Sequence, residues 1–174
     1  MRLRTELLSS PVGELRLVVD DQDALRALEF DSHDERLHRL LKRYYGRYEF
    51  AEGKVPGTMR MALEAYFGGD PSQLDALPVA TGGTEFQRRV WQALRGIPAG
   101  TTISYGELAI RIGRPGASRA VGLANGANPV AIVVPCHRVI GANGTLTGYG
   151  GGLPRKRWLV EHERGNVQGE LALA

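Results

Sequence analysis

A stretch rich in glycine, proline and aspartate, residues 70–83, divides this chain of 174 residues into two halves with different patterns. These residue types disfavour the interiors of helices and strands, so such a stretch is typical of a linker between domains. A chain of this length can hold one medium domain or two small ones. We therefore expect two domains, residues 1–80 and residues 84–168.

The start of the chain contains three short runs of strand-forming residues, 3–8, 14–19 and 24–30. Between these runs lie Pro11, Gly13 and a cluster of aspartates, which favour tight turns. Short connections of this kind join neighbouring antiparallel strands. The pattern therefore predicts a three-stranded antiparallel sheet in the N-terminal domain.

Two helices are predicted after these strands. Ser32 and Glu35 have the S-x-x-E spacing of a capping box, which marks the start of a helix. A second helix is predicted over residues 58–67, where two glycines follow. The first helix should be amphipathic and lie on the sheet, because five apolar residues recur on one of its faces: Leu37, Leu40, Leu41, Tyr44 and Tyr45.

The C-terminal half has a helical pattern interrupted by glycines. Thr84 is suited to the N-cap of one helix, and Pro154 to the first turn of a last helix that ends at Gly165. Between these two, Ser104 begins a short helix that ends at Gly113. A further short helix follows, and its expected inward face consists of small residues: Ala117, Ala120, Val121 and Ala124.

Two short helices joined by a glycine-containing turn match the helix-turn-helix pattern. Asn143 and Gly144 then favour a tight hairpin, which would form a small wing. We therefore expect an α+β fold. An N-terminal α/β domain with an antiparallel sheet and packed helices would precede a mostly helical C-terminal domain that contains a winged helix-turn-helix.

Charge is distributed unevenly along the chain. Residues 1–83 carry 11 lysines and arginines against 14 aspartates and glutamates, or −3, whereas residues 84–174 carry 11 against 5, or +6. A basic half indicates an anionic partner, and nucleic acid is the commonest large one. Charge alone favours an ordinary surface of solvated arginines, so the assignment of a nucleic-acid partner depends on other residues.

Composition excludes several classes of protein. A single cysteine allows neither an intrachain disulfide nor a cysteine-rich metal site. The longest strongly apolar run, residues 130–136, is far shorter than the roughly 20 residues that span a bilayer. The N-terminus lacks the apolar segment of a signal peptide. We therefore expect a cytoplasmic protein with no membrane partner, no bound metal and no cofactor.

The one cysteine, Cys136, ends the apolar run and is followed by His137 and Arg138. A cysteine in an apolar segment is most often a small buried residue, but a cation or base beside it can favour the reactive thiolate. Adjacent side chains seldom face each other, so His137 would act on the thiol through a water molecule. A carboxylate would orient this histidine, and Glu161 or Glu163 could supply it.

Residues 135–139, Pro-Cys-His-Arg-Val, resemble the signature of the O6-alkylguanine-DNA alkyltransferases, also called methylated-DNA–protein-cysteine methyltransferases. The resemblance covers residues 84–165, because further motifs follow in the family's order and spacing. The N-terminal half resembles the family's α/β domain only in its length and in its pattern of strand-forming and helix-forming segments. The further motifs are residues 104–105, 118–122, 128–129, Tyr149 before a glycine run, and 158–163.

The resemblance implies direct reversal of DNA damage, in which the alkyl group of O6-alkylguanine passes irreversibly to Cys136 in a single turnover. His137 would be the water-mediated base. Glu163, of the two glutamates left open above, would be its orienting carboxylate. Tyr105 would donate a hydrogen bond to guanine N3 and stabilise the charge of the leaving base.

The family's helix-turn-helix is thought to enter the minor groove of double-stranded DNA, which suits small residues such as Ala120 and Gly122. Arg119 would insert into the base stack as the damaged nucleotide flips out, and Ser118 beside it would also contact DNA. Binding would be mainly to phosphates, with weak sequence preference. We expect a monomer in solution, and cooperative binding along DNA is compatible with it.

The pocket for the alkylated guanine would use further residues of the same half. Asn128 would fix the turn beneath the active-site segment, and the backbone at Cys136 and Val139 would read the exocyclic amine. Tyr149 and the glycines after it would line the alkyl pocket. Some relatives carry serine or a larger residue after this tyrosine, so Gly150 would leave room for alkyl groups larger than methyl.

One departure from the family concerns zinc, which some relatives hold with cysteines and histidines of the N-terminal domain. Residues 1–83 contain His33 and His38 but no cysteine, so we predict no zinc site here. Three other functions fit less well. A non-catalytic relative would lack the nucleophile, a cysteine hydrolase would need a recognisable oxyanion motif, and a winged-helix transcription factor would need more polar side chains on its recognition helix.

Overall fold

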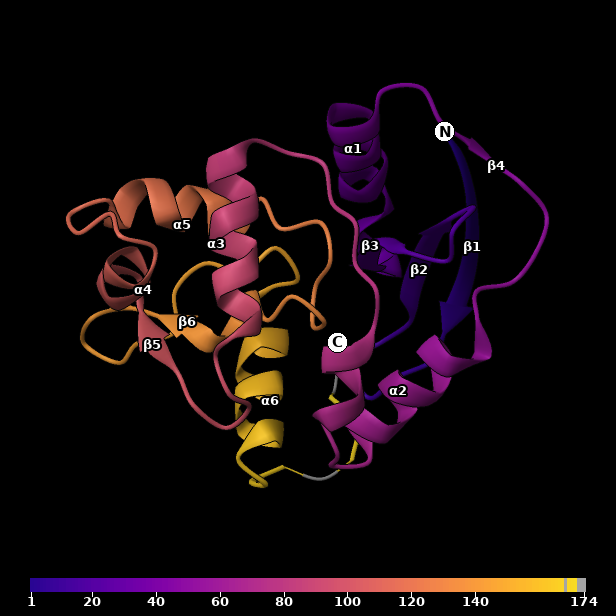
Figure 1. Cartoon of the computed structure of the whole chain (residues 1–174). Helices are drawn as coiled ribbons and strands as arrows, with labels where there is room; N and C mark the ends of the chain where they lie inside the picture. The colour runs from indigo at the N-terminus through magenta and orange to yellow at the C-terminus, as the bar shows by residue number, and fades with distance from the viewer. Residues whose placement is uncertain (168, 172–174) are drawn as a thin grey trace. The chain divides into compact units, whose positions relative to one another are not determined.

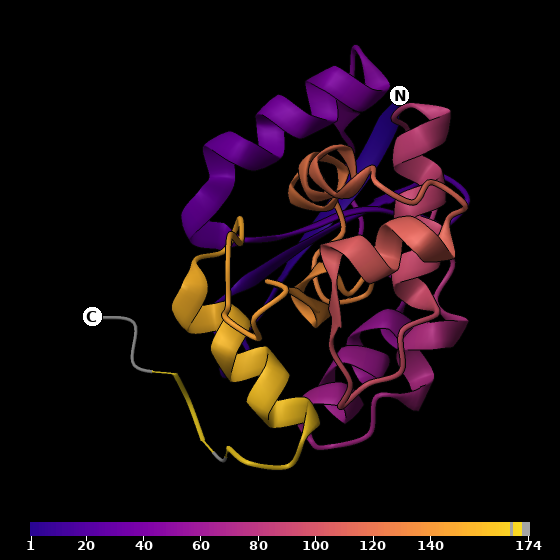
Figure 2. The ribbon, with the colours of Figure 1, turned by 90° about the vertical axis from the view of Figure 1, so that its left-hand side faces the viewer.

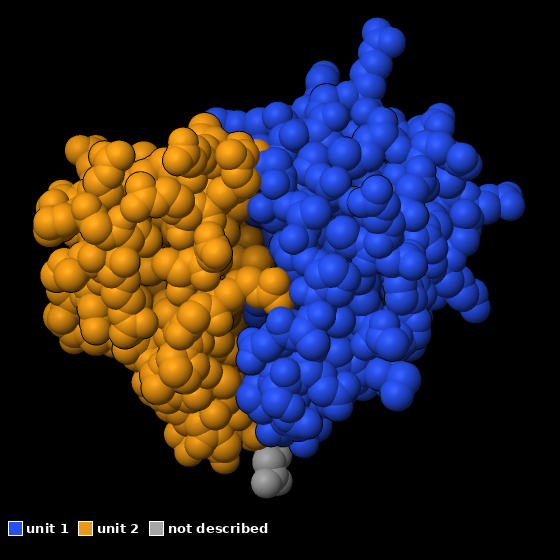
Figure 3. Space-filling view, in the orientation of Figure 1, with its two compact units in different colours: residues 1–82, 129–133, 169–174 blue, residues 83–128, 134–168 orange. Residues whose placement is uncertain are grey.

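The computed structural model describes residues 1–167 and 169–171, which form two compact units (Figure 3). Of these residues, the first unit holds 1–82, 129–133 and 169–171, and the second holds 83–128 and 134–167. Residue 168, the expected end of the second domain, lies outside the described residues. None of the described helices is long and apolar enough to cross a bilayer.

The first unit is built on a four-stranded sheet with the order β3-β2-β1-β4 (Figure 1). The predicted antiparallel arrangement of β1 (Arg2–Leu8), β2 (Leu15–Asp20) and β3 (Leu25–Phe30) is confirmed. A short edge strand, β4 (Glu49–Phe50), was not predicted, and it pairs with β1 in parallel.

Helix α1 (Asp34–Tyr45) packs on this sheet, as its apolar spacing predicts. The predicted capping box is wrong. Ser32 lies inside a 3-10 turn, Asp31–His33, so the N-cap position falls on His33 and no side chain caps the helix. The core beneath the helix consists of buried residues from three strands and from α1: Leu3, Val18, Ala27, Leu37 and Leu41.

Helix α2 (Gly57–Phe67) ends at Gly68, as predicted, and a 3-10 turn, Ser72–Ala76, follows it. An ion pair of 2.8 Å between Arg60 and Glu6 connects α2 to β1.

Residues 129–133 belong to the first unit, although we expected them within the C-terminal domain. The reason is a parallel bridge between Leu28 and Val130. Two backbone hydrogen bonds of 3.0 Å, one from Leu28 N to Pro129 O and one from Ala131 N to Leu28 O, connect this segment to β3. The chain therefore returns to the first unit shortly before Cys136.

The second unit is mostly helical. Helix α3 (Glu85–Arg95) begins with the predicted N-cap, Thr84, which forms a complete capping box with Gln87. Helix α6 (Leu153–Glu163) closes the unit and carries proline in its first turn, as predicted. Two short strands, β5 (Ile103–Ser104) and β6 (Val139–Ile140), pair in parallel and tie the segment after Cys136 to the start of the helix pair.

Helices α4 (Tyr105–Arg111) and α5 (Ser118–Gly126) form the predicted helix-turn-helix and pack against each other (Figures 1 and 2). Two details differ from the prediction. Ala120 is exposed, because the buried stripe of α5 consists of Val121, Ala124 and Asn125. The wing is a loop with a turn at residues 141–145, because β6 pairs with β5 and forms no hairpin across the Asn-Gly turn.

Candidate active site

Cys136 begins a 3-10 turn, Cys136–Arg138, directly after the apolar run. The thiol-bearing residue is 7% exposed. Two buried amides hold the backbone on either side of Pro135. Asn128 Nδ2 donates to Val134 O at 2.8 Å, and Asn125 Nδ2 donates to Cys136 O at 3.3 Å. The backbone that carries the thiol is therefore fixed from helix α5 and the residues that follow it.

Three charged or titratable side chains form a buried cluster next to this turn. His137 Nε2 lies 2.9 Å from Glu163 Oε2, at the end of α6. Arg138 binds both oxygens of the same carboxylate, through Nε at 2.9 Å and Nη2 at 2.7 Å, and its Nη1 donates to Ile97 O at 2.6 Å. Of the two glutamates left open by the sequence, the structure brings Glu163 to the histidine, whereas Glu161 pairs with Arg164.

The Glu163 carboxylate is ionised in this environment. Burial opposes its ionisation, but the attraction to His137 and the hydrogen bonds from Arg138 outweigh burial and hold the pKa of the carboxyl well below its usual range. An ionised carboxylate is an acceptor only, so it favours the tautomer of His137 with the proton on Nε2. Nδ1 is then an acceptor, and this buried atom has no hydrogen-bond partner among the described residues.

Lys156 is a fully buried cation that the sequence analysis missed. Its Nζ donates to Val139 O at 2.6 Å, to Thr147 O at 2.7 Å and to Gly148 O at 3.3 Å. Burial lowers the pKa of Lys156 to about 8, and an electrostatic interaction with Cys136 opposes part of that shift. The lysine therefore joins α6 to the loop after β6 and places a positive charge near the thiol.

The aromatic residues predicted for the pocket lie on α4 and on this loop. The Tyr105 hydroxyl donates to Thr147 O at 3.3 Å and accepts from Thr147 Oγ1 at 3.4 Å. Tyr149 is half-buried two residues further on, and Gly150 after it is exposed. Val139 is fully buried, with its carbonyl bound by Lys156. The structure thus connects Tyr105 to the loop that carries Tyr149.

The predicted DNA-binding residues Ser118 and Arg119 are exposed at the start of α5. In the described part of the chain, Arg119 has no hydrogen bond or ion pair. The same helix connects them to the active site, because Asn125, near its other end, binds the carbonyl of Cys136.

Three residues of this site were missed or given another role by sequence reasoning. Arg138 was considered only as a cation beside the thiol, whereas it binds Glu163. The sequence feature that could have identified Lys156 and Asn125 is their spacing. Each lies three or four residues from an apolar residue on the buried face of the same helix. A polar residue at such a position has to find partners inside the protein.

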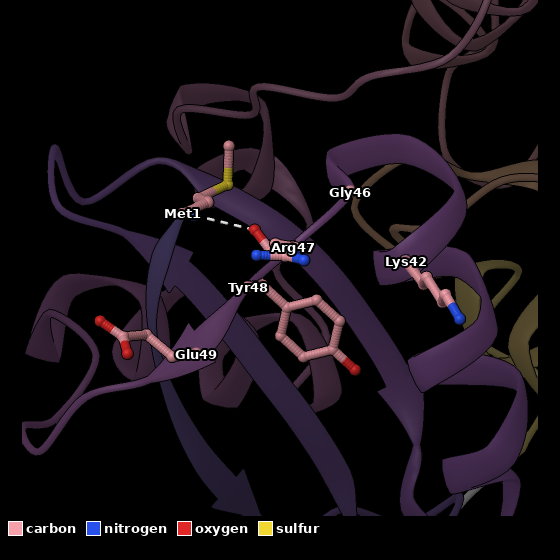
Figure 4. A pocket seen from close by; sticks show the side chains of 6 residues that line it. All are labelled: Met1, Lys42, Gly46, Arg47, Tyr48 and Glu49. Carbon is pink, nitrogen blue, oxygen red and sulfur yellow. Dashed lines mark hydrogen bonds between the residues drawn. The ribbon is translucent and has the colours of Figure 1, made fainter.

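A separate cavity of about 670 Å³ lies in the first unit (Figure 4). It is lined by Met1, Lys42, Gly46, Arg47, Tyr48 and Glu49, and the amino group of Met1 donates to Arg47 O at 2.9 Å beside it. None of these residues is a thiol or a predicted site residue. Within residues 1–167 and 169–171, no cluster of three His, Cys, Asp or Glu residues could hold a metal ion.

Comparisons with known proteins identify the family of this chain. The family model described as 6-O-methylguanine DNA methyltransferase, DNA binding domain, matches residues 85–165. The model described as 6-O-methylguanine DNA methyltransferase, ribonuclease-like domain, matches residues 3–81. The chain is similar over most of its length to curated and solved relatives.

A methylated-DNA–protein-cysteine methyltransferase of Salmonella typhimurium is 53% identical over 165 residues, which cover 94% of this chain and 96% of the relative. The protein of the same name from Mycobacterium bovis is 60% identical over 168 residues, 95% of each chain. A crystal structure of Mycobacterium tuberculosis OGT in complex with DNA has a TM-score of 0.76 and 44% identity, and covers 95% of this chain and 94% of that one. The chain therefore belongs to the 6-O-methylguanine DNA methyltransferase family.

Proposed function

We propose that Cys136 is the alkyl acceptor with which this chain, a DNA-repair alkyltransferase, removes the alkyl group from O6-alkylguanine. The Cys136 thiolate attacks the alkyl carbon, and a bond from Sγ to carbon forms as the bond from carbon to guanine O6 breaks. The electron pair of the broken bond stays on the guanine. The bonds and charges of this displacement balance without an added cofactor.

His137 is the base in this proposal. With the proton of its ring on Nε2 and directed at Glu163, its Nδ1 accepts the thiol proton through a water molecule. Arg138 supports this arrangement, because its two bonds to Glu163 keep the carboxylate ionised and in place. The proton that His137 takes up is then available to neutralise the departing guanine.

The product is a thioether, from which the thiolate is a poor leaving group, and the chain has no second cysteine to displace it. Each protein molecule therefore transfers one alkyl group and is consumed. Regeneration by hydrolysis would need an activated water directed at the alkyl carbon, with the Cys136 thiolate as the leaving group. A single turnover is the consequence of a thiol used as a reagent.

The pocket residues take the roles that the family resemblance implies. Tyr105 exchanges its long bond to Thr147 for guanine N3 and stabilises the charge that develops on the leaving base. Val139, fixed by Lys156, presents its backbone to the base, and Asn128 holds the active-site turn. Tyr149 lines the alkyl pocket, and the exposed Gly150 leaves room there for groups larger than methyl.

The DNA is bound by the second unit through the helix-turn-helix. Helix α5 enters the minor groove with Ser118 and Arg119 at its exposed start, and Arg119 fills the gap in the base stack when the damaged nucleotide flips out. Contacts are mainly to phosphates, so sequence preference is weak and affinity falls with salt. Residues 84–168 thus carry the chemistry, residues 1–80 support it, and the protein acts as a cytoplasmic monomer.

The single observation that carries the proposal is the buried His137–Glu163–Arg138 cluster beside the chain's only cysteine. It is tested by incubating the protein with a duplex that contains one O6-methylguanine and measuring its intact mass. We expect a gain of one methyl group per molecule, located on the peptide with Cys136, and no gain in Cys136→Ser. An unchanged mass of the wild-type protein contradicts the proposal.

A further inference from the structure

Asn125 is a polar residue on the buried face of the helix proposed to bind DNA. It is 5% exposed and shares the buried stripe of α5 with Val121 and Ala124. Packing at this position needs only an apolar side chain. The presence of a buried amide must therefore be explained by the hydrogen bonds that it makes.

The two polar atoms of the Asn125 amide have different environments. Nδ2 donates to the carbonyl oxygen of Cys136 at 3.3 Å. Oδ1 is buried and has no hydrogen-bond partner among the described residues. Because both atoms are bonded to the same carbon, the unpartnered acceptor lies close to the Cys136 carbonyl. Native proteins rarely leave such an atom unpaired, so its position indicates a donor that arrives with a bound molecule.

The proposed substrate brings a suitable donor to this place. In O6-alkylguanine the ring atom N1 carries no proton, so the exocyclic 2-amino group is the hydrogen-bond donor on the Watson–Crick edge of the base. A carbonyl oxygen can accept two hydrogen bonds, and Asn125 Nδ2 and the backbone N–H of Val139 already occupy both positions of Cys136 O. Beside this carbonyl, Asn125 Oδ1 is therefore the acceptor that one hydrogen of the amino group can use.

We propose that Asn125 is a specificity-determining residue that reads the 2-amino group of the flipped purine through its unpartnered Oδ1. This inference rests on the proposed function, and it adds a side chain to the backbone contacts expected there. Nδ2 holds the Cys136 carbonyl in position, and Oδ1 completes the recognition. Alkylated bases without the amino group, such as O6-alkylhypoxanthine and O4-alkylthymine, leave Oδ1 unpaired and react more slowly.

The test compares two substrates in two proteins. Rate constants for alkyl transfer are measured for wild type and Asn125→Leu, with O6-methylguanine and O6-methylhypoxanthine at the same site of the same duplex. Leucine has nearly the shape of asparagine but neither polar atom. We expect wild type to prefer O6-methylguanine by about tenfold, and the variant to lose about fivefold of this preference, as the loss of one buried hydrogen bond predicts.

A matched control is Asn166→Leu, which changes an exposed asparagine beyond α6 and should leave both rates unchanged. An equal slowing of both substrates in Asn125→Leu overturns the inference, because the residue would then only position Cys136. Equal reaction of wild type with the two substrates also overturns it, even where the variant does not fold. Failure of wild type to react with either substrate is a failure of the proposed function, and the inference falls with it.

Asn125→Asp provides a second variant that keeps an acceptor oxygen but loses the Nδ2 donor. We expect it to react slowly with both substrates, because the Cys136 carbonyl is no longer held, while the preference for O6-methylguanine persists. A loss of the preference in Asn125→Asp contradicts the role assigned to Oδ1. Thermal unfolding of each variant shows whether the measured rates come from folded protein.

Discussion

The two compact units bury charged side chains in different ways. In the first unit the buried charges are carboxylates, Asp20 and Glu29, and each is paired with an arginine that is partly exposed, Arg26 or Arg36. In the second unit most of the buried charged side chains are cations: Arg138, Arg155 and Lys156. His137 is buried as well, and two of these residues, His137 and Arg138, bind Glu163.

The difference also concerns satisfaction of hydrogen bonds. Among the described residues, no buried side-chain atom of the first unit lacks a hydrogen-bond partner, whereas the second unit leaves Asn125 Oδ1 and His137 Nδ1 without one. Burial of an unsatisfied polar atom costs stability, about 1–3 kcal/mol each. These two atoms of the second unit therefore lower its stability, whereas the first unit carries no such cost among its described residues. We interpret the difference as a first unit organised for stability and a second unit organised for chemistry.

The largest effect is expected from substitution of Glu163, which we compare with Glu29, a second buried glutamate that pairs with an arginine. Glu163→Gln leaves Arg138 without its counter-ion, so we expect the free energy of unfolding to fall by about 3 kcal/mol. It also removes the acceptor that sets the tautomer of His137, so the rate of alkyl transfer should fall by about 100-fold or more. Urea unfolding and the rate constant with O6-methylguanine duplex measure the two effects.

Glu29→Gln in the first unit is the matched comparison, since Glu29 is equally buried and bound by Arg36. We expect a similar loss of stability and an unchanged rate per folded molecule. Glu161→Gln, at a partly exposed position of α6, should change neither quantity. A fall in the rate of Glu29→Gln would show that the first unit takes part in the chemistry.

The second effect concerns Lys156, whose pKa burial lowers from 10.5 to about 8. Between these two values the unfolded state binds a proton that the folded state does not, so this residue makes stability rise with pH. We expect the unfolding free energy of wild type, relative to Lys156→Met, to increase by about 2–3 kcal/mol from pH 8 to pH 10.5. Denaturant unfolding at several pH values measures this.

Lys42→Met removes an exposed lysine of α1 and is the matched control for the loss of one positive charge. The rate of alkyl transfer gives a second readout. Without Lys156, the loop from Val139 to Gly148 loses three hydrogen bonds, and we expect the rate at pH 7 to fall by about tenfold. An unchanged rate would mean that the loop is held by other contacts.

Local patterns predicted much of the fold. The N-cap at Thr84, the stop at Gly68 and the apolar face of α1 all depend on residues close in sequence, and the structure contains them. The prediction failed where a distant segment decides. Strand β4 has only two residues and exists because it pairs with β1. The Ser32 box failed for a local reason, because Ser32 lies inside the 3-10 turn Asp31–His33.

The candidate site shows the same division. The Pro-Cys-His-Arg-Val run identified Cys136 and His137, but it could not show that Arg138 binds Glu163, 25 residues away. Whether Ala120 faces inward depends on how α5 rotates against its neighbours, and α5 buries Asn125 instead. Burial of Asn125 and Lys156 is a tertiary property, so a single sequence marks their positions without revealing their partners.

The third prediction concerns the DNA surface of the second unit. Arg119→Ala should slow repair of O6-methylguanine in duplex DNA by about tenfold, because the gap left by the flipped base is then unfilled. The reaction with free O6-benzylguanine, which needs no flipping, should keep its rate. Arg43→Ala, an exposed arginine on α1 of the first unit, should affect neither reaction. Equal slowing of both substrates by Arg119→Ala would remove the flipping role.

The smallest effect concerns Leu123, which is 74% exposed on α5 one turn after Arg119. An apolar side chain on a surface that meets the minor groove gains stability by packing against sugars and bases, so Leu123→Ala should weaken DNA binding by about threefold. Because no charge is removed, the slope of log K against log salt should stay the same, whereas Arg119→Ala should reduce it. Met61→Ala removes a comparably exposed apolar side chain, 64% exposed on α2, and should leave DNA binding unchanged. An equal loss of affinity in the two variants would mean that DNA also contacts the first unit, and the contrast between a supporting unit and a binding unit would no longer hold.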